Sequence, residues 1–77
     1  MDTKTKIKDI LANLLKVKIE ELKDDLSLQD SIGLDSTEMV ESLIALEKAF
    51  GVKLNPKEVK KTSTINEIAG NIQAKLA

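Results

Sequence analysis

The chain contains neither cysteine nor histidine among its 77 residues. Without these side chains the protein has no imidazole to activate a serine and no thiol with which to hold an acyl group. A hydrolase triad is therefore excluded, and we expect no catalytic residue. Zinc sites built from cysteine or histidine ligands are excluded as well, so we expect no metal site. The reactive groups for any covalent chemistry must be supplied by a prosthetic group or by a partner protein.

Arginine is also absent, and Phe50 is the sole aromatic residue. The 12 basic side chains are all lysines, and with 13 acidic ones they give a net charge of −1. Base readout and RNA stacking favour arginine and aromatic side chains, so we expect no nucleic-acid partner. A helix-turn-helix protein is further disfavoured because Glu38, Glu41 and Glu47 would make its recognition helix acidic.

Long hydrophobic runs are missing too. No apolar run approaches the ~20 residues of a membrane-spanning helix, and residues 1–8 lack the apolar segment of a signal peptide. We therefore expect a soluble, cytoplasmic protein, and the length predicts one domain over residues 1–77. Its core must be almost entirely aliphatic, because the chain has one aromatic residue. We expect the fold to be only modestly stable, because no disulfide or metal ion stabilises it.

Hydrophobic periodicity predicts helices and no strands. Apolar residues at spacings of three and four predict a first helix over about 3–16. A long connection over 17–35 follows, with apolar residues scattered among charges. Because a structureless loop of that length is unusual, we expect its apolar side chains to tuck against the helices, with one short turn near 19–22.

The second helix is predicted to run to Phe50 and to end at Gly51, which supplies the positive φ of a helix end. Helical spacing divides its residues into two faces. The face toward the core contains Met39, Leu43, Leu46 and Phe50, with Val40 and Glu47 at its edge. The adjacent strip contains Thr37, Val40, Glu41, Ile44 and Lys48. Ile44 lies off the core centre, which favours contact with a partner.

Two further helices are predicted. Asn55 as N-cap and Pro56 at the first helical position indicate a short third helix to about Lys61. Thr64 and Glu67 form a capping box that opens a fourth helix. The apolar stripe of that helix contains Ile65, Ile68, Ala69, Ile72 and Leu76. The predicted fold class is therefore all-α, a small four-helix bundle with three main helices, a short third helix and a long first loop.

The sequence Gly33-Leu34-Asp35-Ser36 stands at the head of the second helix. The first backbone N–H groups of a helix lack internal partners and the helix dipole is positive there, so a phosphate ester on Ser36 would be favoured. The alternative is that Ser36 is an ordinary helix-start residue and Asp35 an ordinary N-cap.

Together these features resemble the acyl carrier protein family and its peptidyl and aminoacyl carrier relatives. The resemblance covers essentially the whole chain. It includes the long first loop, the Gly-x-Asp-Ser motif ending at Ser36, the stretch Ala45-Leu46-Glu47 before Phe50, the short third helix after Leu54, and Thr64 at the start of the fourth helix.

The resemblance implies a carrier and not an enzyme. Ser36 would be esterified with 4′-phosphopantetheine, taken from coenzyme A by a magnesium-dependent phosphopantetheinyl transferase, and Asp35 would cap the helix and help that transferase. The terminal thiol would then hold acyl or aminoacyl groups as thioesters. Acyl-activating, condensing and acyl-transfer enzymes would be the partners of a monomer. An unmodified helical interaction module remains the alternative from another class.

The resemblance also implies two further sets of residues. Acidic positions that meet basic patches on partner enzymes correspond to Glu38, Glu41 and Glu47, although a solvated helix face explains them equally well. Glu41 beside Ile44 is the best candidate, because a charge next to an exposed apolar residue gives both steering and an anchor. The predicted partner strip comprises Thr37, Glu38, Val40, Glu41, Ile44, Glu47 and Lys48. Candidates for lining an acyl chain, which are core residues first, are Leu43, Leu46, Leu54, Val59, Ile68 and Ile72.

Several residues depart from the family pattern. Thr37 replaces the usual Leu or Met after the serine, and Thr62 stands where an apolar residue is common. Lysines replace the usual acidic character of the partner strip and the third-helix region, at positions 48, 53, 57, 60 and 61. Each would repel a basic enzyme patch. We therefore hypothesise a specialised carrier, in fatty acid, polyketide or related biosynthesis, rather than the housekeeping fatty-acid carrier.

Overall fold

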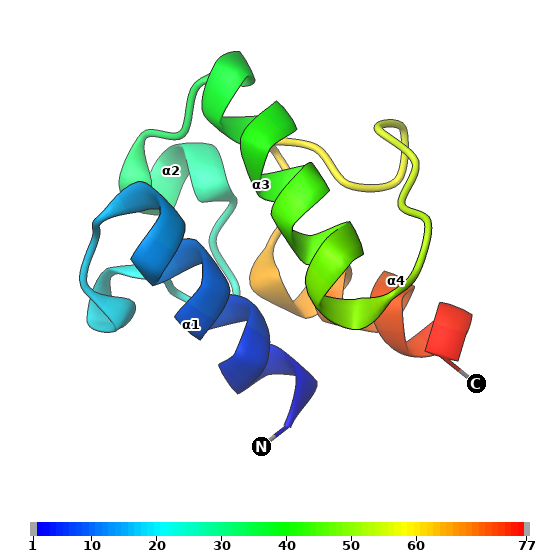
Figure 1. Ribbon diagram of the computed structural model, residues 1–77. Helices are drawn as coiled ribbons and strands as arrows, with labels where there is room; N and C mark the ends of the chain where they lie inside the picture. The colour runs from blue at the N-terminus through cyan, green and yellow to red at the C-terminus, as the bar shows by residue number, and fades with distance from the viewer. Residues whose placement is uncertain (1, 77) are drawn as a thin grey trace.

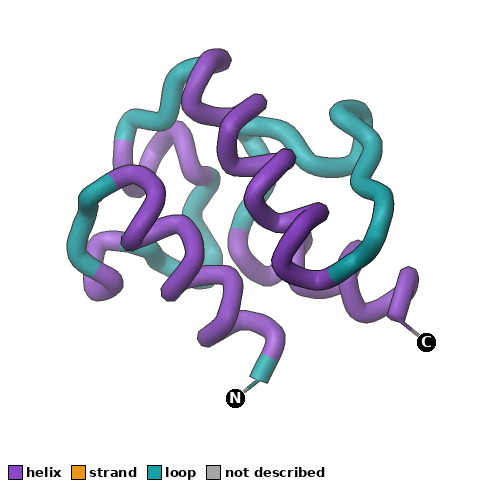
Figure 2. Tube along the Cα trace, viewed as in Figure 1, coloured by secondary structure: helices purple, strands orange, loops and turns teal. Residues whose placement is uncertain are grey.

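Helices make up the fold of residues 2–76, which are the residues described by the computed structural model (Figures 1 and 2). The elements in chain order are α1 (Thr3–Leu15), a 3-10 turn η1 (Ile19–Glu21), α2 (Leu28–Ile32), α3 (Ser36–Phe50) and α4 (Ile65–Leu76). Within the described residues the only β pairing is an isolated antiparallel bridge between Ser27 and Thr64. The predicted all-α class is confirmed, with four helices, but the short helix lies in the first loop and not after α3.

The core lies between α1, α3 and α4. Helix α1 packs against both α3 and α4, and α1 and α3 lie side by side in opposite directions (Figure 1). Aliphatic side chains from every helix fill the space between them, and the fully buried ones include Ile7, Leu11, Leu28, Leu46, Ile65, Ile68 and Ile72. The stripes predicted from helical spacing therefore face the core for most of their length, as expected for amphipathic helices. Leu76 of the predicted α4 stripe does not, because it lies at the end of α4, beyond the core, and is 52% exposed.

The ends of the main helices agree with the sequence signals. Helix α3 ends at Gly51, whose φ of 66° is the left-handed conformation that glycine adopts without strain. At the start of α4, the Thr64 N–H donates to Glu67 Oε1 at 2.9 Å and the Glu67 N–H donates to Thr64 Oγ1 at 3.1 Å. This reciprocal pair is the predicted capping box.

The first loop contains a short helix that was not predicted. Helix α2 begins after Ser27, whose hydroxyl accepts from the Asp30 N–H at 3.0 Å, and Leu28 is its buried anchor. A helix of 5 residues is too short to show a hydrophobic period, so sequence spacing gave no signal for it. The turn expected near residues 19–22 is present as η1.

The predicted third helix is wrong. Residues 55–61 form turns instead, beginning where the Asn55 carbonyl accepts from the N–H groups of Glu58 at 2.8 Å and Val59 at 3.1 Å. The chain then leaves the helical path, because the Lys61 carbonyl accepts from the Gln29 N–H of α2 at 2.9 Å. Forming a helical nucleus is unfavourable, and so short a segment adds few bonds to offset it, so the tertiary hydrogen bond prevails.

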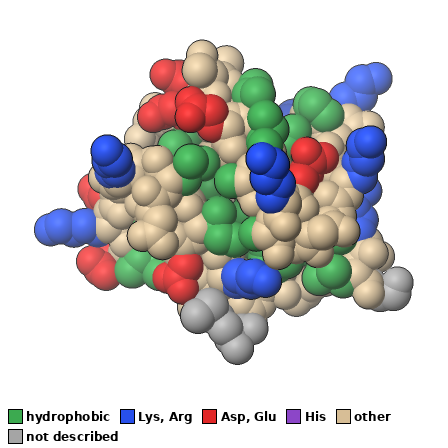
Figure 3. Space-filling model, in the orientation of Figure 1, with side chains coloured by type: hydrophobic (Ala, Val, Ile, Leu, Met, Phe, Trp, Pro, Cys, Tyr) green, Lys and Arg blue, Asp and Glu red, His purple; other side chains and the backbone are tan. Residues whose placement is uncertain are grey.

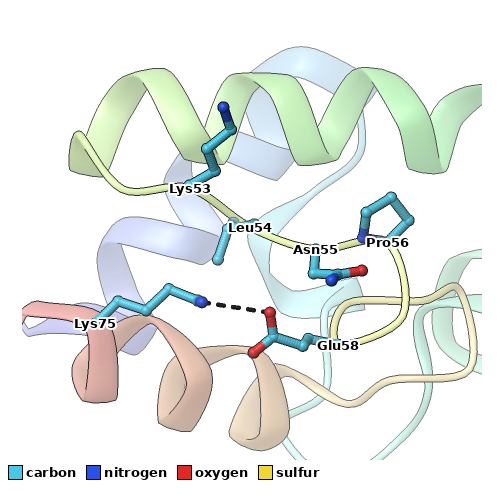
Figure 4. A pocket seen from close by; sticks show the side chains of 6 residues that line it. All are labelled: Lys53, Leu54, Asn55, Pro56, Glu58 and Lys75. Atoms are coloured by element: carbon cyan, nitrogen blue, oxygen red, sulfur yellow. Dashed lines mark ion pairs between the residues drawn. The ribbon is translucent and has the colours of Figure 1, made fainter.

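The loop after α3 is fastened at several points, and Figure 4 shows one of them, the ion pair between Glu58 and Lys75. The Leu54 N–H donates to Glu47 Oε2 at 2.8 Å, the Asn71 side-chain amide donates to the Glu58 carbonyl at 3.0 Å, and Lys75 of α4 pairs with Glu58 at 3.3 Å. A hollow of about 390 Å³ lies between this loop and Lys75. The loop therefore has a fixed position against both α3 and α4, although it is not helical.

Asp24 joins the first loop to α1 and α4. Its carboxylate pairs closely with Lys8 and lies 3.8 Å from Lys4 Nζ, while its carbonyl accepts from the Asn66 N–H at 3.1 Å. The hydrogen bond from Lys8 lowers the pKa of Asp24, and the Thr5 N–H in the same way lowers the pKa of Asp2. Both carboxylates therefore favour the folded state only while they are ionised.

The depressed pKa values predict a loss of stability in acid. Their contribution is present above the unfolded-state pKa of about 3.9 and disappears as the pH falls through the lower folded-state values. We expect Asp24→Asn to lower the free energy of unfolding at neutral pH. Below about pH 4, the free energy of unfolding should fall less steeply with pH in this variant than in wild type. Urea unfolding at several pH values measures this, with Asp25→Asn as the matched control. Identical pH profiles for the two variants would contradict the assignment.

Candidate functional site

Four consecutive residues place one hydroxyl on the surface. Gly33 ends α2 in the left-handed conformation with φ of 66°, which turns the chain toward α3. Leu34 is buried and anchors the turn in the core. Asp35 is the N-cap of α3, and Ser36 is its first residue and is exposed. Each residue of the motif therefore has a distinct structural role, and the exposed hydroxyl of the motif is that of Ser36.

The start of α3 is held by reciprocal hydrogen bonds. Asp35 Oδ1 accepts from the Glu38 N–H at 2.8 Å, and Glu38 Oε1 accepts from the Asp35 N–H at 3.1 Å. This capping box was not predicted, although Asp35 as the N-cap was. Because both carboxylates are occupied by backbone groups, the backbone at Ser36 is fixed while its hydroxyl remains free within residues 2–76.

An apolar cleft of about 280 Å³ opens beside Ser36. Its apolar wall comes from α3 and from the loop after α3, and consists of Met39, Val40, Leu43, Pro56 and Val59. Lys60 and Lys61 complete the lining. The cleft therefore joins the exposed serine to a hydrophobic surface, with positive charge at the same place.

The predicted acyl-lining residues separate into three groups. Leu43 and Val59 line the cleft beside Ser36. Leu54 instead lines the hollow near Lys75 (Figure 4). The other three, Leu46, Ile68 and Ile72, are completely buried core residues. Pro56, Lys60 and Lys61 were not predicted as lining residues, because their position beside Ser36 depends on how the loop folds back on α3 and α2. Met39 of α3 was predicted for the core face and not for this lining, and it contributes to both.

The predicted partner strip is largely an exposed face of α3. Val40 is 57% exposed and Ile44 46% exposed, and Thr37, Glu41 and Lys48 are exposed beside them. Hydrophobic side chains gather over α3 in Figure 3, with acidic side chains toward its N-terminal end and lysines over the following loop. Exposed apolar side chains flanked by charged ones are thus present on this face.

The three predicted acidic contacts differ in their surroundings. Glu38 belongs to the capping box, and Glu47 is half-buried with its carboxylate accepting from Leu54 N–H. Glu41 is exposed and makes no hydrogen bond or ion pair with any residue that the structure describes. Glu47 therefore serves the fold first, and Glu41 is the acid of this strip whose charge is available to a partner.

The described residues contain neither a metal site nor a membrane-spanning helix. Within residues 2–76, no three side chains of the metal-ligating kinds His, Cys, Asp or Glu come together as a metal site. Across the same residues, none of the helices has the length and hydropathy needed to cross a membrane.

Comparison with known proteins finds a family and relatives that match most of the chain. Residues 5–72 match the family described as "Phosphopantetheine attachment site". The chain is 35% identical over 69 residues to an acyl carrier protein of Clostridium acetobutylicum, covering 90% of each chain. It is 32% identical over 72 residues to an acyl carrier protein of Thermotoga maritima, covering 94% of this chain and 89% of the relative. The family match includes every residue of the cleft and of the partner strip.

Proposed function

The chain belongs to the acyl carrier protein family, whose members are carriers bearing a covalent 4′-phosphopantetheine, and on that premise we propose that Ser36 is the attachment point. The observation that carries this proposal is the free, exposed hydroxyl at the start of α3 beside an apolar cleft. The other serines of the chain are half-buried or buried. Ser36 is therefore the serine that a modifying enzyme reaches.

The residues around Ser36 fit a phosphate ester. The first N–H groups of α3 have no helical partner, and the positive end of the helix dipole lies at the same place. Asp35 holds this end of the helix in one conformation through its bond from the Glu38 N–H. The apolar cleft offers a surface on which the uncharged part of the arm can rest.

Loading needs an external base, because the chain has no histidine. Ser36 Oγ forms a bond to the phosphorus of the pantetheine half of coenzyme A, and the phosphoanhydride bond to the adenosine 3′,5′-bisphosphate half breaks. The hydroxyl proton passes to a base of the transferase, and the bisphosphate leaves. When bound, the arm supplies the thiol on which acyl or aminoacyl groups are carried as thioesters.

Glu41, Val40 and Ile44 then form the surface that meets acyl-activating, condensing and acyl-transfer enzymes. Glu41 supplies long-range attraction to a basic patch, and the two exposed apolar side chains supply the contact area. We place this carrier in the cytoplasm, as a monomer, in fatty acid, polyketide or related biosynthesis.

Intact-mass spectrometry tests the attachment. The protein is incubated with coenzyme A and a phosphopantetheinyl transferase of broad specificity. We expect a mass increase of one phosphopantetheinyl group, and fragmentation should place it within residues 35–37. No increase, under conditions that fully convert another acyl carrier protein, would favour the unmodified interaction module.

The lysines near α3 lead to a prediction about partner choice. Lys48 is exposed on the partner strip, and Lys53 and Lys57 are exposed on the following loop. Because like charges repel, we expect this protein to bind the ketosynthase of an ordinary acidic carrier more weakly than that carrier does.

Charge reversal tests this explanation. Lys48→Glu should raise the affinity for that ketosynthase by about threefold, the size expected for one exposed charge pair. Lys23→Glu makes the same change of charge in the first loop and should leave the affinity unchanged. Wild-type binding as tight as that of the acidic carrier would overturn the specialised assignment.

A further inference from the structure

We infer that Lys60 and Lys61 bind the phosphodiester of the arm attached to Ser36 and so hold the arm along the cleft. This inference rests on the proposal that Ser36 is the attachment point. The phosphodiester carries one negative charge and is tethered at Ser36, and the two lysines supply ammonium groups from another part of the chain. The residues that carry it lie on α3, on the loop after α3 and on α2.

The first observation is shared lining. Ser36, Lys60 and Lys61 all border the same cleft of about 280 Å³. Apart from the Ser36 hydroxyl, the two ammonium groups are the polar side-chain groups of this lining, and they are its charged ones. A phosphodiester attached at Ser36 therefore has two lysines in the lining of the same cleft.

The second observation is that the backbone of both lysines is fixed. The Lys60 N–H donates to Ser63 Oγ at 3.0 Å, and Ser63 is only 8% exposed. The Lys61 carbonyl accepts from the Gln29 N–H at 2.9 Å, and the Ser63 carbonyl accepts from the Leu28 N–H at 3.1 Å. These bonds tie the segment to the start of α2, so the lysine stems emerge from a constrained position beside the cleft.

The third observation is that neighbouring acids do not neutralise the pair. Glu58, two residues before Lys60, pairs instead with Lys75 at 3.3 Å. The ion pairs of residues 2–76 otherwise join Asp24 to Lys4 and Lys8. Both ammonium groups are thus available to an anion, within the part of the chain that the structure describes.

Local charge makes such a pair useful. Asp35 and Glu38 hold two carboxylates at the start of α3, and these would repel a phosphodiester on Ser36. The two lysines that line the cleft offset that repulsion. Lysine suits this role because its ammonium is a compact point charge on a flexible stem and does not require one orientation of the phosphate.

The experiment compares apo and holo forms, after mass spectrometry has established that each holo sample is loaded. In wild type at low salt, we expect loading to raise the folding equilibrium constant by about threefold, as for exposed charge pairs. High salt should remove the gain by screening. The double variant Lys60→Gln/Lys61→Gln should lose it, whereas Lys60→Arg/Lys61→Arg should keep it.

Lys53→Gln/Lys57→Gln is the matched control, because it removes the same charge from the same loop outside the cleft. It should keep the gain. The ³¹P chemical shift of wild-type holo protein gives a second readout that needs no variant, and it should move with salt. The inference would be overturned if the Lys60→Gln/Lys61→Gln protein matched wild type in both measurements. These are the rise in the folding equilibrium constant on loading and the ³¹P chemical shift of the holo form. Failure of wild type to load at all would overturn the attachment proposal instead.

Discussion

Ser36→Ala is expected to abolish attachment of the phosphopantetheinyl group completely. The substitution removes the oxygen that would form the ester, and no other exposed serine is present among residues 2–76. The fold should be unaffected, because the hydroxyl has no hydrogen-bond partner in the described part of the chain and alanine is a good helix former. The free energy of unfolding should therefore change by less than about 0.5 kcal/mol. Intact mass and urea unfolding, measured on one sample, separate loss of the acceptor from loss of the fold.

Ser31→Ala is the matched control for this experiment. Ser31 lies on α2, five residues before Ser36, and its hydroxyl is buried and makes no hydrogen bond within residues 2–76. This variant should load as wild type does. Loading that persists in Ser36→Ala, or that disappears in Ser31→Ala, would show that the ester forms on another residue.

The main helices and the serine were predictable because their signals are local. Caps such as Thr64 with Glu67 and the positive φ of Gly51 depend on only a few neighbouring residues. The exposure of Ile44 followed from helical spacing alone. The motif ending at Ser36 was recognisable for the same reason, since its turn, anchor, cap and hydroxyl are consecutive.

The segments whose structure differs from the sequence prediction depend on contacts between distant parts of the chain. The Asn55 turn has the start of a helix, but the Lys61 carbonyl is taken by Gln29, which lies more than thirty residues earlier. The sequence near either residue contains no pattern that predicts such a hydrogen bond. The same contact brings Lys60 and Lys61 to the cleft, so the sequence predicted their charge and not their location.

Glu47 illustrates how one residue type serves two purposes on a single helix. Spacing placed it at the edge of the core face, and the resemblance placed it among the partner contacts. Its carboxylate accepts from the Leu54 N–H at 2.8 Å and thereby fixes the loop that supplies one wall of the cleft. Glu41, more than one helical turn earlier, makes no such bond and retains its charge for steering.

Leu46→Ala is expected to cause the largest loss of stability among single substitutions on α3. Leu46 is 0% exposed, and truncating a buried leucine to alanine costs about 2–5 kcal/mol through lost transfer energy and the cavity left behind. A core of this size supplies only about 3–5 kcal/mol in total, so the variant should be largely unfolded in thermal and urea experiments. Leu46→Met conserves the volume and should cost less than about 1.5 kcal/mol, which keeps the comparison measurable.

Ile44→Ala gives the opposite result at a position two residues away on the same helix. Because Ile44 is 46% exposed, its loss should change the free energy of unfolding by about 0.5 kcal/mol or less. The affinity of the Ile44→Ala protein for a partner enzyme should fall by about tenfold, which is the effect of removing a contact worth ~1.4 kcal/mol. Unfolding and binding therefore separate the two faces of α3. A stable Leu46→Ala protein, or unchanged binding by Ile44→Ala, would mean that the core face or the partner strip has been assigned wrongly.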